Sequence, residues 1–406
     1  ANLSKFLTIG VNAQFADRNE GFYRIDILQA VNQSPWTQMR DENGNLYYWP
    51  NEDQLVTNPF TYYDNRQIHN KTQTLFAVLF GELTLPYGLS YRVNYSNNYL
   101  WNKNYLFDPI ETPRGLTNNG YGQRSLRNIN NWMIDNIIKW NYTVAGIHAF
   151  DFTFLVNAEE NRSWSDVQTN YQMEPSLALG YHALQSGSYP EIQNNDVIST
   201  GNALMARMNY VLKNRYLLTL AWRRDGYSAF GQKNPYAEFP SAAVAWTITE
   251  EDFFNVDWIS NMKMRLSWGV NGNRDIGAYD ALARLSTINY LYGNSAATGV
   301  YSSTMANSEL RWEKTESINV GLDYGFFNSR VYGSIDLYQS STTDLLLRRS
   351  LPQLIGYSDV MSNLGELENR GIEITLSSVN INTSNITWKS NFTFSLNRNK
   401  IISLYG

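Results

Sequence analysis

The sequence contains no cysteine, so neither a disulfide framework nor a thiolate metal site can form. No run of apolar residues approaches the roughly 18 to 20 that a membrane-spanning helix needs. The formal net charge is −5, and phosphate binding requires a basic stripe, so nucleic acid is not an expected partner. These absences exclude a helical membrane protein and argue against a nucleic-acid binder.

Recognisable catalytic motifs are also missing. The three histidines, His69, His148 and His182, lack metal-ligand spacing, and no GxSxG or P-loop pattern occurs. Carboxylate pairs for glycoside hydrolysis stay open, because spacing alone does not exclude them. We expect no catalytic residue and no cofactor. Because such carboxylate pairs stay open, an enzyme is the main rival class, and an assay for hydrolysis of glycans or peptides tests it.

One stretch imitates a calcium-binding loop. Asp41, Asn43, Asn45 and Glu52 supply oxygen side chains, but Leu46 stands where such a loop needs glycine and no helical pattern flanks it. We expect no metal site there and interpret the Asn-Gly pair at 43–44 as a tight hairpin turn.

What the chain does contain is apolar residues at every second position. Between 311 and 347, Ile318, Val320, Leu322 and Tyr324 alternate with polar residues, and a second alternating segment follows a short reversal near 328. Successive side chains of a strand point to opposite faces, so this stretch predicts a hairpin with one apolar face. Such a face packs on a soluble core or against lipid, and the extent of the pattern decides between them.

The alternation recurs along the whole chain and predicts about thirteen strands, many of 9 to 14 residues. Short turns are expected near 86, 145, 214, 328 and 382, with a moderate one near 250. Long polar loops are expected at 18–71, 102–128, 164–200 and 271–310. An outer-membrane barrel has short turns at one rim and long loops at the other, so we predict an all-β, transmembrane antiparallel β-barrel with its apolar faces toward lipid.

Two groups of residues follow from the alternation. Tryptophans on apolar faces are expected to face lipid or to form interfacial girdles; they are Trp132, Trp140, Trp222, Trp268 and Trp388. Charged residues on polar faces are expected to point into the lumen, where opposite charges can pair across strands; they are Arg207, Arg223, Arg265, Asp323, Asp336 and Glu373.

Several stretches resemble signatures of the SusC/RagA family of TonB-dependent outer-membrane transporters. The chain reads RYLL at 215–218, RDGYSAFG at 224–231 and FPSAAVAW at 239–246, similar to the family's RYLL, RxDGSSxFG and FPSxxxAW. It reads LSWGVNGN at 266–273, LRWEKT at 310–315, NLGELENRGIE at 363–373 and NRNKI at 397–401, similar to SYGxxGN, LxWEKT, NxGxxxNxGxE and NxNKI. Tyr227 departs from the family's usual serine, which changes one loop side chain.

The resemblance implies structural roles for the residues that carry it. These residues are Arg224, Asp225, Gly226, Phe230, Gly231, Phe239, Pro240, Trp312, Glu313, Asn369 and Gly371. Arg224 and Asp225 are expected to brace a strand end.

The resemblance also implies a 22-stranded barrel with an N-terminal plug, located in the outer membrane of a Gram-negative bacterium. Such a transporter imports oligosaccharides or peptides with energy from TonB, beneath a SusD-like surface lipoprotein. Nothing in the chain resembles the plug or the TonB-contact segment, and the chain begins without methionine on a strand pattern. We therefore expect residues 1–406 to be the middle part of the barrel, with the plug absent and the ring incomplete. A passive glycan- or protein-binding barrel is the alternative, and a homodimer of barrel–lipoprotein pairs is left open.

Aromatic residues of the first long loop are candidates for ligand or lipoprotein contact, because rings with polar tips suit both. They are Trp36, Tyr47, Tyr48, Trp49, Tyr62 and Tyr63. The alternative for each residue is that it packs the loop on itself.

Overall fold

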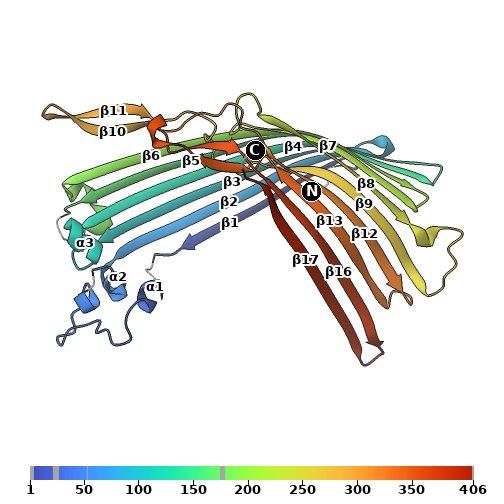
Figure 1. Cartoon of the computed structure of the whole chain (residues 1–406), viewed down its shortest axis with the longest axis horizontal. Coiled ribbons are helices and arrows are strands. Elements are labelled where there is room, and N and C mark those ends of the chain that lie inside the picture. Colours follow the sequence, from blue (N-terminus) through green and yellow to red (C-terminus); the bar gives the residue numbers. More distant parts are fainter. Residues whose placement is uncertain (1–3, 22–26, 53, 174–178, 405–406) are drawn as a thin grey trace.

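The computed structural model describes residues 4–21, 27–52, 54–173 and 179–404. Its main feature is one antiparallel sheet of thirteen strands, which confirms the predicted number (Figure 1). In the order of the sheet, which is also chain order, the strands are β1 (Leu7–Asn19), β2 (Gln67–Thr84), β3 (Leu89–Asp108), β4 (Tyr121–Val144), β5 (His148–Tyr171), β6 (Tyr189–Leu212), β7 (Tyr216–Tyr227), β8 (Tyr236–Thr247), β9 (Ile259–Asn273), β12 (Glu313–Phe326), β13 (Val331–Thr343), β16 (Glu366–Asn382) and β17 (Thr387–Ser403).

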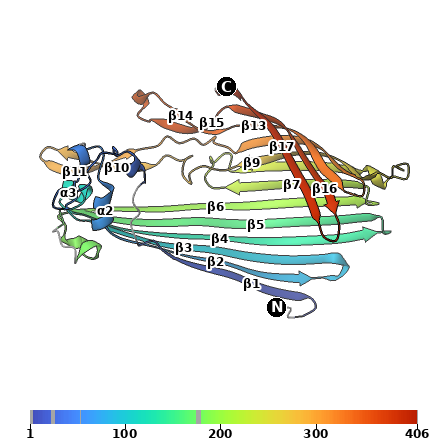
Figure 2. The same ribbon diagram turned by 90° about the horizontal axis from the view of Figure 1, so that it is seen from below.

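The sheet is a curved, open wall. Among the described residues, β1 pairs only with β2 and β17 only with β16, so the expected incomplete ring is found. The thirteen strands follow one another around the sheet in chain order, so successive connections fall alternately at the two edges of the wall that the strand ends form. The connections at 85–88, 145–147, 213–215, 248–258, 327–330 and 383–386 share one edge. The connections at 20–66, 109–120, 172–188, 228–235, 274–312 and 344–365 share the other edge, and all of these except 228–235 are longer than those of the first edge, which confirms the predicted asymmetry (Figure 2).

Several strands are much longer than predicted. Strands β4, β5 and β6 have 24 residues each, and the loops predicted at 102–128 and 164–200 are wrong, because most of those residues belong to β3–β6. The true connections are 109–120 and 172–188. Outside the bilayer neither face of a strand needs apolar side chains, so the alternation fades while the backbone ladder continues. The register of β4 with β5 is unbroken from Tyr121 to Val144.

The remaining long connections carry small elements. Residues 20–66 form the first long loop, as predicted, and include α1 (Ile27–Val31) and α2 (Pro59–Asn65), while α3 (Pro113–Asn118) lies between β3 and β4. The loop predicted at 271–310 is also more ordered than expected, because it contains the hairpin of β10 (Leu285–Tyr292) and β11 (Ser295–Ser302). A second small hairpin joins β14 (Leu346–Ser350) to β15 (Asp359–Asn363). Short 3₁₀ turns are η1 (Pro50–Glu52), η2 (Pro86–Gly88), η3 (Gly180–His182), η4 (Leu184–Ser186), η5 (Ile248–Glu250) and η6 (Gln353–Ile355).

No helix in the described part of the chain is long and apolar enough to cross a membrane.

The apolar face of the sheet is exposed, as the lipid-facing prediction requires. Ile318 pairs with Trp268 and Val320 with Leu266, so their side chains share one face. Ile318 is 46% exposed and Val320 45%, whereas these residues would be buried if they packed on a soluble core. Lipid replaces that core in a barrel wall.

The opposite face carries charged groups that pair across strands, also as predicted. The guanidinium of Arg265 on β9 donates to Asp323 on β12 at 2.9 and 2.8 Å and to Asp336 on β13 at 3.0 Å. One arginine thus joins three neighbouring strands on the lumenal side. The half-buried setting strengthens such charge-assisted hydrogen bonds relative to exposed ones.

Candidate functional site: a polar cavity at the outer rim

The stretches that carry the resemblance meet at the edge of the long connections. Phe230, Leu310 and Trp312 are 3%, 0% and 4% exposed and form an apolar cluster with Ala237 and Ala281. The rings of Phe230 and Trp312 stack with centroids 4.8 Å apart. Burial of two aromatic side chains contributes several kcal/mol, roughly 2–3 for each. This cluster fastens the connection 274–312 onto β7 and β8.

Two glycines allow this close packing. The backbone N–H of Gly231 donates to the carbonyl of Leu310 at 2.9 Å, and a Cβ on Gly231 would lie 2.2 Å from the carbonyl oxygen of Ser308. A Cβ on Gly272 would lie 2.2 Å from the ring of Phe239. Both positions therefore need glycine for space and not for an unusual φ.

Arg224 and Asp225 do not act as one brace. Asp225 faces the lumen and accepts from the Nε and Nη2 of Arg223 at 2.7 and 2.8 Å. Arg224 points to the other face, where its guanidinium lies 4.6 Å from the ring centroid of Tyr236. Side-chain alternation places the two neighbours on opposite faces of β7, so each makes its own contact near this strand end, and the expected bracing role stays a prediction.

The other motif residues have structural contacts. Glu313 accepts from the backbone of Leu346 at 3.1 Å, and Asn369 accepts from Asn399 at 2.8 Å. A Cβ on Gly371 would lie 2.5 Å from the ring of Tyr338.

Two further motif residues lie on β7 and β8. A Cβ on Gly226 would lie 2.4 Å from the ring of Tyr236, and Pro240 pairs with Trp222 on the apolar face.

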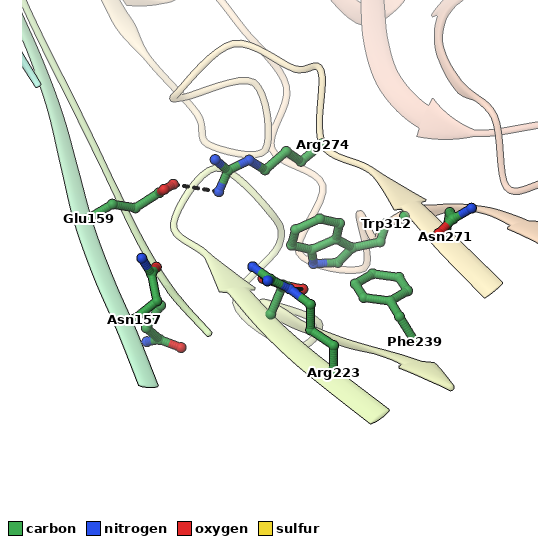
Figure 3. Close-up of a pocket in the computed structure, with 10 residues that line it drawn as sticks. Asn157, Glu159, Arg223, Phe239, Asn271, Arg274 and Trp312 are labelled. Carbon is green, nitrogen blue, oxygen red and sulfur yellow. Dashed lines mark hydrogen bonds and ion pairs between the residues drawn. The ribbon is translucent and has the colours of Figure 1, made fainter. Parts of the chain in front are cut away.

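Beside the aromatic cluster is a polar cavity of about 330 Å³. Its lining comes from β5, β6, β7, β8, β9 and the two ends of connection 274–312 (Figure 3). The lining residues are Asn157, Glu159, Asn202, Arg223, Asp225, Phe239, Asn271, Gly272, Arg274 and Trp312.

One ion pair spans this cavity. Glu159 on β5 and Arg274, directly after β9, reach toward each other from opposite sides, with 2.6 Å between Oε1 and Nη1 (Figure 3). Three strands separate β5 from β9 in the sheet, so the pair crosses over β6–β8. The guanidinium of Arg274 also lies 4.6 Å from the ring centroid of Tyr227. The connection 274–312 is thereby held against the wall on both sides of the cavity.

The cavity offers hydrogen bonds to a neutral polar molecule. Two guanidinium groups and two carboxylates balance in charge, and amides of Asn157 and Asn271 supply further donors and acceptors. The side chains of Arg223 and Arg274 are 41% and 42% exposed, so each has N–H groups that can donate to a bound molecule. Sequence reasoning missed Glu159 and Arg274, because Arg274 lies in the predicted loop 271–310 and Glu159 lies just before the predicted loop 164–200, far from Arg274 in sequence.

The six aromatic candidates of the first long loop lie elsewhere. They stay together in residues 20–66, and none lines the cavity. Trp36 is 92% exposed and Tyr63 56%, while Tyr47 is also exposed and Tyr48 lies against Trp49 with ring centroids 5.8 Å apart. Their contact role stays a prediction.

The loop is fastened to the wall through Tyr62 and its neighbour Arg66. The guanidinium of Arg66 lies 4.2 Å from the Tyr62 ring centroid and donates to the fully buried Asp108 at 2.6 and 2.9 Å. Asp108 also accepts from Arg114 at 2.6 Å, so one carboxylate anchors α2 and α3 to β3.

The stretch that imitates a calcium loop is a hairpin turn, as predicted. Gly44 has φ +88°, and the Asp41 carboxylate accepts from the backbone of Asn43 and Asn45 at 2.8 Å each. These bonds, with one from the Asn45 amide as the largest cause, lower the pKa of Asp41. Within the described residues, no group of three or more His, Cys, Asp or Glu is placed to hold a metal ion.

The model of one protein family matches residues 14–403 and is described as "TonB dependent receptor-like, beta-barrel". The chain belongs to this family. The TonB-dependent receptor SusC of Bacteroides thetaiotaomicron is 33% identical over 316 residues, which are 73% of this chain and 30% of SusC. TonB-dependent receptor P26 of Formosa agariphila is 29% identical over 415 residues, 98% of this chain and 40% of the receptor. The chain thus spans well under half of these TonB-dependent receptors.

Solved structures agree on the fold. A structure of the RagAB peptide transporter superposes with a TM-score of 0.83 at 22% identity, covering 100% of this chain and 46% of that one. The RagAB peptide importer in a "closed-closed" state gives 0.81 at 23% identity, covering 100% and 46%. The resemblance to SusC/RagA-type TonB-dependent receptors is confirmed. The chain therefore belongs to a β-barrel of the outer membrane of Gram-negative bacteria.

Proposed function

We propose that residues 1–406 form the middle part of a longer, 22-stranded barrel that imports oligosaccharides or peptides. In this proposal TonB supplies the energy, and a SusD-like surface lipoprotein covers the long connections. The names of the relatives support this direction, since SusC is called a TonB-dependent receptor and RagAB a peptide transporter. The reaction class is transport, without bond-making.

The observation that carries the proposal is the cavity at the outer rim. It is polar, balanced in charge and open to the lumenal side, where arriving cargo first meets the wall. Recognition of neutral, hydroxyl- or amide-rich molecules needs such convergent hydrogen-bonding groups. The exposed N–H groups of Arg223 and Arg274 provide fixed donors, because Asp225 and Glu159 hold the two guanidinium groups in place.

Uptake of labelled oligosaccharides and peptides by cells that carry the full-length transporter tests the proposal. Uptake should disappear when TonB is deleted. Replacing Arg274 by Gln should lower uptake several-fold, because it removes charged donors from the cavity. Lys233→Gln is the matched control, since Lys233 is exposed and pairs with Glu309 outside the cavity.

Each other outcome points elsewhere. Uptake that persists without TonB would favour the passive binding barrel. Release of cleaved glycan or peptide by the purified protein would favour an enzyme. Equal uptake by the Arg274 and Lys233 variants would remove the cavity from the proposal.

A further inference from the structure

The outward row of β3 marks how far the membrane reaches up the wall. On β3 the outward positions from Leu89 to Trp101 are apolar or aromatic, apart from the buried Asn97. Twelve residue steps at about 3.3 Å, on a strand tilted by about 40°, give a height of about 30 Å, the thickness of the hydrocarbon layer. The rings of Tyr99 and Trp101 stack at 5.3 Å where this row ends. They mark the outer interface.

Cations occupy the next outward positions. Lys103 follows Trp101 on the same face of β3, and it lies directly opposite Lys71 on β2. Arg124 on β4 lies opposite Tyr105, with its guanidinium 4.3 Å from that ring's centroid. We call Lys71, Lys103 and Arg124 the cationic patch.

The cationic patch carries more positive charge than the carboxylates paired with it can balance. Lys71 has an ion pair with Asp17 at 3.1 Å. Across the described ranges of the chain, neither Lys103 nor Arg124 forms an ion pair. Like charges directly opposite each other on neighbouring strands destabilise a sheet, and Asp17 offsets only one member of the pair. An external anion would offset the positive charge that remains on the patch.

The patch has defined borders. Leu126, beside Lys103, pairs on its other side with Asp166 of β5, whose carboxylate accepts from Asn194. The excess of positive charge therefore ends at β4. Because the patch faces away from the lumen, arriving cargo does not reach it.

We propose that the cationic patch binds a phosphate group of a phosphorylated glycolipid in the outer leaflet. The height of the patch places Lys103 and Arg124 at the headgroup layer, directly above the aromatic interface. Lysine and arginine near a membrane surface attract anionic headgroups by about 1 kcal/mol each, equivalent to about fivefold in affinity. Guanidinium and ammonium groups are the usual partners of phosphate.

Titration of the detergent-solubilised full-length protein with lipid A tests this site. Diphosphoryl lipid A, dephosphorylated lipid A and inorganic phosphate are compared by native mass spectrometry. Wild type should retain diphosphoryl lipid A and bind the other two weakly. The double variant Lys103→Glu/Arg124→Glu should bind diphosphoryl lipid A at least about tenfold more weakly, because two attractive charges become repulsive.

Arg127→Glu is the matched control for Arg124→Glu. Arg127 is three residues away on β4, exposed and on the lumenal face, and it should leave lipid binding unchanged. Equal loss in the two single variants would mean that a general charge effect, and not a site, explains the binding. Equal retention of phosphorylated and dephosphorylated lipid A by wild type would overturn the proposal. Strong binding of inorganic phosphate alone would instead indicate a free-anion site.

Discussion

The two halves of the wall differ in height. Strands β3–β6 have 20 to 24 residues, whereas β7–β9, β12 and β13 have 12 to 15. Tilted strands need about 9 to 11 residues to cross a membrane, so the tall half extends far outside it and the low half barely does. Figure 1 shows the tall strands reaching one end of the molecule, where α1–α3 lie.

The halves complete the rim in different ways. In the tall half the strand ladder itself forms the rim, and Asp108 anchors the small helices to it. In the low half the rim is built from connections, which the cluster around Trp312 packs onto β7 and β8. The cavity lies at the step between them, bridged by Glu159 of the tall half and Arg274 of the low half. Wall height therefore decides whether hydrogen bonds between strands or packed side chains shape the entrance.

The largest expected effect is in the low half. Replacing Trp312 by Ala should destabilise the barrel by about 3–5 kcal/mol, because a fully buried ring is lost from the cluster. Trp268→Ala is the control, since Trp268 lies on the lipid-facing side and is 37% exposed. The thermal transition of the purified protein measures both. A smaller loss at Trp312 than at Trp268 would contradict the view that packing holds the low rim.

A smaller effect distinguishes two strand glycines. Gly272→Ala on β9 should cost about 1–3 kcal/mol, because its Cβ would meet Phe239 and Trp312 at 2.2 and 3.1 Å. Gly81→Ala on β2, which pairs with β3 of the tall half, should be neutral or slightly stabilising, since nothing lies within 4 Å of its Cβ. Denaturant unfolding of the two variants gives the comparison. Equal costs would show that strand conformation matters more than rim packing.

Alternation in the sequence predicted the membrane part of both halves. Rows such as Ile318, Val320 and Leu322 revealed the lipid face, and Arg265, Asp323 and Asp336 revealed the lumenal pairing, because two different solvents select different residues. Above the bilayer this selection stops. Arg162, Asp166 and Gln168 stand in the outward row of β5 and are polar, yet they continue the ladder. The extent of the tall half is set by backbone pairing, which a hydrophobic pattern does not encode.

The cavity was beyond prediction for a related reason. Glu159 and Arg274 are 115 residues apart in sequence and meet only because the low strands β7 and β8 leave space above them. Nothing in the residues next to either one indicates its partner. The cluster residues Phe230 and Trp312 were found through a resemblance, and their contact with each other became visible only in three dimensions.

The smallest expected effect is a pH dependence of the turn 248–258 in the low half, which lies at the edge of the short connections. Glu251 accepts from the Tyr216 hydroxyl, from Trp246 Nε1 at 2.9 Å and from Arg215 at 3.2 Å, while Asp252 accepts from Arg215 at 2.8 Å. The Tyr216 bond is the main cause that lowers the pKa of Glu251, and the Arg215 bond does so for Asp252.

Because both carboxylates have a lowered pKa in the folded turn, their stabilisation is present above their ordinary pKa values and is lost as the pH falls through the lowered ones. Backbone amide exchange in 248–258, corrected for intrinsic rates, should therefore rise modestly between pH 6 and pH 3. The turn 145–147 of the tall half contains no titratable side chain and should not respond. Glu251→Gln/Asp252→Asn should remove the pH dependence, and a turn 248–258 that responds equally in this variant would show that other groups titrate there.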